Sequence, residues 1–157
     1  IFMESEQMYG DKMEVPEGEY IIPIGVADIK REGTDVTIVS FGKIIKEAYK
    51  AADELAKENI SVEIIDLRTV RPMDHNAILK SVKKTNRLII LEESWPFGSV
   101  SSEITYRIQD EAFDYLDAPI KRITTADTPA PYSPVLLEKW LPNYNNVIKA
   151  VKEVLYI

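Results

Sequence analysis

The sequence predicts an α/β fold, a three-layer α/β/α arrangement with a mostly parallel sheet of about five strands. Two observations predict it. Short apolar, β-branched runs alternate with longer segments whose apolar residues recur at helical spacing. The runs are continuously apolar, which is typical of strands that are buried on both faces of a parallel sheet.

Size and composition agree with a single globular domain. The chain has 157 residues, of which 45% are hydrophobic and 29% are charged. No apolar run approaches the roughly 18 residues that span a bilayer, so no membrane protein is expected. The absence of cysteine excludes disulfides and thiolate metal sites. A net charge of -7 argues against nucleic-acid binding and suits a basic protein partner.

Residues 1–34 are expected to form a linker that leads into the domain and carries a short edge strand. The candidate strand is Tyr20–Ile24, and Pro23 restricts it to a sheet edge because proline cannot donate to the strand ladder. The chain opens with Ile1-Phe2-Met3 instead of an initiating methionine. We therefore expect a fragment of a longer protein.

Residues 35–157 are expected to form the domain proper, built from strand and helix units. Strands are predicted at 36–39, 62–65, 88–91 and 119–123, and helices at 43–58, 74–84, 99–113 and 144–155. Asn59 suits the C-terminal end of the first helix, and the Asp74 carboxylate suits the N-cap of the second. The proline-rich residues 126–143 are predicted to be a loop.

Ligands of open α/β sheets usually bind beyond the carboxyl ends of the strands. The residues predicted there are Ser40, Phe41, Gly42, Asp66, Arg68, Glu92, Glu93, Ser94, Thr124, Thr125 and Asp127. Their carboxylates could bind a metal ion or act as a general acid and base. We favour helix capping and pairing with arginine, because the adjacent Glu92 and Glu93 project in opposite directions on an extended strand.

Other candidate sites are incomplete. Ser40–Lys43 has one glycine and lacks the rest of a dinucleotide fingerprint. The helix start at Gly98-Ser99 could hold an anion, but an ordinary N-cap role for Ser99 is favoured. His75, the only histidine, is expected at the surface. The loop aromatics Trp95, Phe97, Tyr132 and Trp140 either pack inside the domain or form a subunit interface.

Several segments together resemble the C-terminal domain of transketolase-like enzymes. They are Ser40–Gly42, Asp66–Asp74, Leu91–Ser94 and Gly98–Ile104. Within that group the chain is most similar to pyruvate dehydrogenase E1 β subunits, through Phe2–Gly10, Leu116–Pro119, Ala126–Tyr132 and Leu155–Ile157. The resemblance covers essentially the whole chain.

The resemblance implies an α2β2 enzyme that decarboxylates pyruvate and transfers the acetyl group to lipoyl-E2. In that family thiamine diphosphate and Mg²⁺ lie between the α subunit and the N-terminal domain of β. The family's Gly-Asp-Gly diphosphate motif is absent from this chain. No catalytic, cofactor-binding or metal-binding residue is therefore carried over, and the chain alone is expected to bind no cofactor and to be inactive.

The resemblance also implies a role in assembly. This domain would contact the E1 α subunit and a second β subunit, and would dock the subunit-binding domain of the E2 acetyltransferase through Asp117 and the carboxylate of Ile157. The compartment would be the cytoplasm in a bacterium or the mitochondrial matrix in a eukaryote. Two alternatives stay open: the β subunit of a branched-chain 2-oxo-acid dehydrogenase, and a stand-alone α/β protein that binds an anion.

Overall fold

A computed structural model describes residues 1–157 and contains one five-stranded sheet with the strand order β1-β3-β2-β4-β5. The pairs β2–β3, β2–β4 and β4–β5 are parallel, and β1 is antiparallel to β3. The predicted three-layer, mostly parallel α/β fold is confirmed. The strands are β1 (Asp28–Arg31), β2 (Val36–Ser40), β3 (Val62–Asp66), β4 (Leu88–Leu91) and β5 (Lys121–Ile123).

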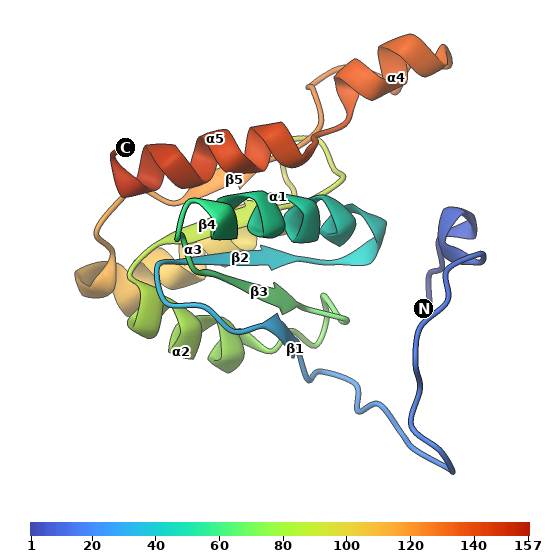
Figure 1. The fold of residues 1–157 in the computed structure, drawn as a ribbon, viewed down its shortest axis with the longest axis horizontal. Coiled ribbons are helices and arrows are strands. Elements are labelled where there is room, and N and C mark those ends of the chain that lie inside the picture. The colour runs from blue at the N-terminus through green and yellow to red at the C-terminus, as the bar shows by residue number, and fades with distance from the viewer.

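Helices cover both faces of the sheet (Figure 1). One face carries α1 (Ile45–Lys57) and α5 (Tyr144–Leu155), and the other carries α2 (His75–Thr85) and α3 (Val100–Ala112). The remaining helices are η1 (Glu6–Met8), η2 (Gly42–Ile44), η3 (Phe113–Tyr115) and α4 (Pro134–Trp140). No helix has the length and apolar character needed to cross a membrane.

Alternation along each strand divides the apolar side chains between two cores. Ile38 of β2 packs toward α1 and α5, whereas the adjacent Val39 packs toward α2 and α3. Both side chains are fully buried. The continuous apolar runs of the sequence are therefore explained by burial on two faces.

Two helix starts are held by the polar side chains that precede them. The Asp74 carboxylate accepts hydrogen bonds from the amides of Ala77, 3.1 Å away, and of Ala27, 3.0 Å away. It thus caps α2, as predicted, and also fixes the chain just before β1. Asn143 begins α5 with a capping box in which its side chain and that of Asn146 each accept a backbone amide.

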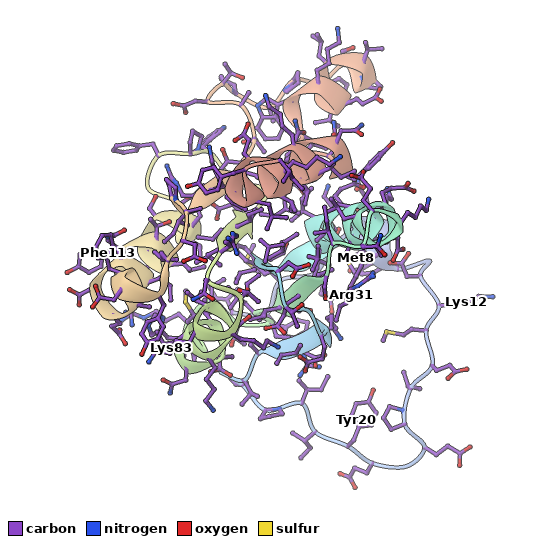
Figure 2. The ribbon with its side chains drawn as sticks, turned by 60° about the vertical axis from the view of Figure 1, so that its left-hand side comes forward. Met8, Lys12, Tyr20, Arg31, Lys83 and Phe113 are labelled. Carbon is purple, nitrogen blue, oxygen red and sulfur yellow. The ribbon has the colours of Figure 1, made fainter.

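The predicted edge strand is present, but its position was wrong. Residues 20–24 form no strand, and the edge strand is β1, which pairs with β3 in the register Ile29↔Ile65. Pro23 removes one backbone donor, and Gly25 then turns the chain with φ +81°, so a regular ladder begins only after them. The segment before β1 projects away from the domain, as Lys12 and Tyr20 in Figure 2 show.

The predicted loop at residues 126–143 contains the short helix α4, which the prediction missed. Pro134 stands at its first position, where the missing amide hydrogen costs nothing. None of its residues is buried, so α4 lacks the apolar stripe that identifies a helix packed on a core. It protrudes from the domain beyond the start of α5 (Figure 1).

Gly33 is buried against β3, and replacing it by Ala is expected to reduce the free energy of unfolding by about 3 kcal/mol. An added Cβ would overlap backbone atoms of Val62 and Glu63, which cannot move without disturbing the sheet. Urea unfolding measures the loss. Gly10→Ala is the matched control, because no atom lies within 4 Å of its Cβ position. Equal stability of the two variants would contradict the close packing at Gly33.

Candidate functional site

The carboxyl ends of β2 and β3 use their polar residues for the turns that follow. Ser40 is buried and donates to the Leu91 carbonyl at 2.9 Å, which ties β2 to β4. Asp66 accepts the Arg68 amide at 3.0 Å, and the Arg68 guanidinium lies 2.5 Å from Asp28. Gly42, with φ +69°, begins η2. These residues therefore shape the backbone. The helix capping and arginine pairing that we favoured from the sequence are not seen for Asp66.

Glu92 occupies the helix start where an external anion was considered. Its carboxylate is fully buried and accepts the amide of Ser101 at 3.2 Å, in the first turn of α3. Ser99 stands at the N-cap, but its side chain caps no amide and its hydroxyl lies 2.8 Å from that of Ser101. The expected capping by Ser99 was therefore wrong, because the protein's own carboxylate fills that role.

The remaining strand-end residues make ion pairs and hydrogen bonds within the protein or lie exposed. Glu93 pairs with Lys43 at 3.1 Å. Thr125 donates to the Ser94 carbonyl at 2.9 Å, and Asp127 is exposed. Nowhere do three or more His, Cys, Asp or Glu side chains gather closely enough to hold a metal ion. The residues of this chain thus do not fit a Mg²⁺ site.

His75 is more buried than expected. Its side chain is only 12% exposed and packs between α2 and α3, where Nε2 lies 3.0 Å from a carboxylate oxygen of Glu111. The expectation of a surface histidine was wrong, because the imidazole is largely covered and lies beside Glu111 of α3. His75 therefore lies at the contact between the two helices, with one carboxylate beside it.

The loop aromatics form an exposed surface next to α4. The indoles of Trp95 and Trp140 both donate to the Thr128 carbonyl, at 2.9 and 3.0 Å. The exposed apolar side chains of the two loops and of α4 are Trp95, Phe97, Tyr132, Val135 and Leu136. We call this set the aromatic surface. The alternative that these aromatics pack inside the domain fails for Phe97 and Tyr132, which are 91% and 104% exposed.

Asp117 and Ile157 lie at the same end of the domain. The Tyr156 hydroxyl donates to the Asp117 carbonyl at 3.4 Å, which joins the chain end to the turn after η3. Figure 1 shows the C-terminus beside the segment that leads into β5. Both Asp117 and Ile157 are exposed. The structure therefore places Asp117 and the C-terminal residues at the same end of the domain, although they stand 40 positions apart in the sequence (157 − 117).

A buried ionic cluster was missed from the sequence. Glu63 of β3 is fully buried and accepts bonds from the hydroxyl of Ser81, the ammonium of Lys84 and the amide of Gly33. The pKa of Lys84 is raised by its hydrogen bonds to Glu32 and Glu63, and the Lys84 ammonium lowers the pKa of Glu32. In the sequence, the one indication of this cluster was a glutamate within the apolar run Val62–Ile65.

Comparisons with known proteins agree with the resemblance. The family model for the transketolase C-terminal domain matches residues 25–147. The pyruvate dehydrogenase E1 component subunit beta of Rhizobium meliloti is 51% identical, across 99% of this chain and 34% of that protein. The acetoin:2,6-dichlorophenolindophenol oxidoreductase subunit beta of Bacillus subtilis is 46% identical, across 98% and 44%. This chain thus spans half or less of these relatives.

A solved structure has the same fold. The inactive β4 tetramer of a split-gene transketolase superposes with a TM-score of 0.77 at 26% identity, over 92% of this chain and 46% of that one. The branched-chain alternative is not favoured by the relatives reported above. The resemblance of the sequence to this family is confirmed.

Replacing Lys84 by Met is expected to lower the free energy of unfolding by about 2 kcal/mol at pH 7, because the Glu63 carboxylate stays buried without a cation. Folding raises the pKa of Lys84 above its ordinary 10.5, so its contribution is complete below that pH and is lost as the pH rises through the folded value. Urea unfolding at several pH values measures the difference between the two proteins, which should shrink above about pH 10.5.

The matched control is Lys80→Met, because Lys80 is exposed on the same helix and forms no ion pair. That variant is expected to change the free energy of unfolding by less than about 0.5 kcal/mol. Equal losses in the two variants, or a Lys84 effect that stays constant through high pH, would count against the ionic cluster.

Proposed function

The chain belongs to the transketolase C-terminal domain family, and from this premise we propose that it is the C-terminal domain of a pyruvate dehydrogenase E1 β subunit. The observation that carries the proposal is 51% identity over 99% of the chain to such a subunit. In this proposal residues 1–34 link the domain to the rest of the subunit and supply the edge strand β1, and residues 35–157 form the remainder of the domain. The whole enzyme decarboxylates pyruvate and passes the acetyl group to lipoyl-E2.

In this proposal the chemistry lies outside this chain. Thiamine diphosphate and Mg²⁺ are held by the α subunit and the rest of β, since no cluster of potential metal ligands exists here. The α subunit and a second β subunit complete the heterotetramer. The complex works in the cytoplasm of a bacterium or in the mitochondrial matrix. The stand-alone anion-binding alternative loses support because Glu92 fills the helix start that would bind the anion.

An acetoin-oxidising enzyme is the second candidate. The 46% identity to the Bacillus subtilis subunit supports it, and that match covers 98% of the chain. The two candidates share a fold and an assembly role but differ in substrate. Turnover of pyruvate against acetoin by the assembled enzyme distinguishes them.

We propose that the E2 subunit-binding domain docks at Asp117 and the C-terminal carboxylate of Ile157. Both groups are exposed at the same end of the domain, so Arg or Lys of a basic partner can reach them. The chain's net charge of -7 would also attract such a partner. Tyr156 orients the chain end through its bond to the Asp117 carbonyl.

Asp117→Ala is expected to weaken binding of the isolated E2 domain to the assembled enzyme at least about tenfold, because a partner cation loses its counter-charge. Deleting Ile157 moves the terminal carboxylate by one residue and is expected to act similarly. Calorimetry at two salt concentrations measures both affinities. The melting temperature should stay nearly unchanged, because both residues are exposed.

Asp114→Ala is the matched control for docking. Asp114 is an exposed carboxylate of η3 without an ion pair, so its removal changes the net charge equally. Its effect on affinity should be less than about twofold. Wild-type affinity in both docking variants would reject the docking role.

We further propose that the aromatic surface contacts a second β subunit. The split-gene transketolase, which shares the fold, is a β4 tetramer. Tyr132→Ser should weaken association of the assembled subunits about tenfold, because burial of an aromatic ring is worth about 1.5–3 kcal/mol. Sedimentation over a range of concentrations measures this. Tyr106→Ser on α3 is the control, since Tyr106 is also exposed but lies outside the aromatic surface. Equal effects would reject the assignment.

A further inference from the structure

Arg87, just before β4, connects two parts of the chain that meet at the proposed docking site. Its side chain is only 23% exposed. Its Nε donates to the Val154 carbonyl at 3.0 Å, and its Nη2 lies 3.4 Å from a carboxylate oxygen of Asp117. One rigid guanidinium therefore contacts both the end of α5 and the acidic side chain.

The contact with α5 has an electrostatic reason. Val154 lies in the last turn of α5, whose carbonyls lack partners within the helix and carry partial negative charge. The Arg87 cation interacts favourably with this partial charge. The two residues that follow α5 are Tyr156 and Ile157, so they continue directly from the turn that Arg87 contacts.

Asn86, the residue before Arg87, also binds the turn that carries Asp117, through two hydrogen bonds. The Asn86 carbonyl accepts the Asp117 amide at 2.9 Å, and the Asn86 side chain donates to the Tyr115 carbonyl at 2.8 Å. The turn after η3 is thus attached to residues 86–87, and the end of α5 is attached to Arg87. Asp117 and the chain end are held at a defined separation by a third segment that carries neither of them.

We propose that Arg87 is a positioning residue for docking, one that sets the separation of the Asp117 carboxylate and the C-terminal carboxylate for a basic partner. The inference rests on the proposed docking function. Asp117 remains 56% exposed while paired with Arg87, so its carboxylate is oriented and still accessible. Arg87 itself is largely covered and acts through the groups that it holds.

Whether removal of Arg87 weakens or strengthens partner binding distinguishes a positioning role from a purely electrostatic one. Arg87 is a cation beside a site for cations, so its removal would strengthen binding if charge alone mattered. Loss of positioning acts in the opposite direction, because the two carboxylates are then no longer pre-arranged.

The experiment is calorimetry on the assembled enzyme with the isolated E2 subunit-binding domain. Arg87→Gln is expected to weaken binding at least about fivefold despite the lost positive charge. Arg87→Lys keeps the charge and most of the volume, but its single ammonium cannot reproduce the fork, so a loss of about threefold is expected. Wild-type or tighter binding by either variant would overturn the positioning role.

Lys83→Gln is the matched control. Lys83 is exposed on α2 (Figure 2) and lies 4.9 Å from the ring centre of Tyr115. Its loss removes an equal charge near η3 and leaves the contacts of Arg87 with Asp117 and α5 in place. Its binding should be unchanged or slightly tighter. A loss as large as that of Arg87→Gln would overturn the inference.

A double-mutant cycle with Asp117→Asn completes the test. If Arg87 acts through Asp117, Arg87→Gln should weaken binding less in the Asp117→Asn background than in the wild type. Additive effects would overturn the coupling. Normal affinity of Asp117→Asn alone would reject the docking proposal itself, whereas a weak Asp117→Asn with a normal Arg87→Gln would reject only this inference.

Discussion

Burial of the central strand on both faces is the constraint on which the rest of the structure depends. Every residue of β2 is buried, so the sheet must be covered by helices on each side. The few polar side chains buried on the sheet then determine where α2 packs. Thr37 of β2 and Glu63 of β3 are register neighbours, and their polar groups find partners on α2 in Ser81, Lys84 and Thr85. A buried hydroxyl or carboxylate without such partners is costly, so this network favours one position of α2 on the sheet.

The need to give buried polar groups partners within the protein also bears on where contacts with other molecules are expected, which is at the two ends of the domain. The carboxyl ends of the strands, the usual place for a ligand, are filled by Ser40, Glu92 and Thr125, which bond to the protein itself. Arg87 and Asp117 precede β4 and β5, so the proposed docking site lies at the amino ends of the parallel strands. The aromatic surface follows the carboxyl ends of the same strands. The proposed docking site and the aromatic surface therefore lie at opposite ends of the parallel strands.

Most of the fold could be predicted from periodicity, because four strands and four helices carry strong apolar patterns. The errors occur where a long-range partner overrides a local preference. Ser99 is a good N-cap by residue type, yet Glu92, seven positions earlier (99 − 92), takes its place. The strand at β1 has little apolar character and exists because β3 offers it a free edge. Asp117 and Ile157 were named only through resemblance, since no local pattern reveals that Arg87 contacts both Asp117 and the end of α5.

The two indoles that share the Thr128 carbonyl confine the tryptophan fluorescence of this domain to one region. Trp95 and Trp140 are the only tryptophans in the chain. Trp95 belongs to the aromatic surface, and Trp140 is joined to Trp95 through the shared Thr128 carbonyl. Neither tryptophan is part of the two apolar cores. Tryptophan emission from this protein therefore reports the environment of one corner. A shift of its wavelength would follow the covering of that corner by another subunit, while loosening of the buried sheet would be followed better by far-UV circular dichroism.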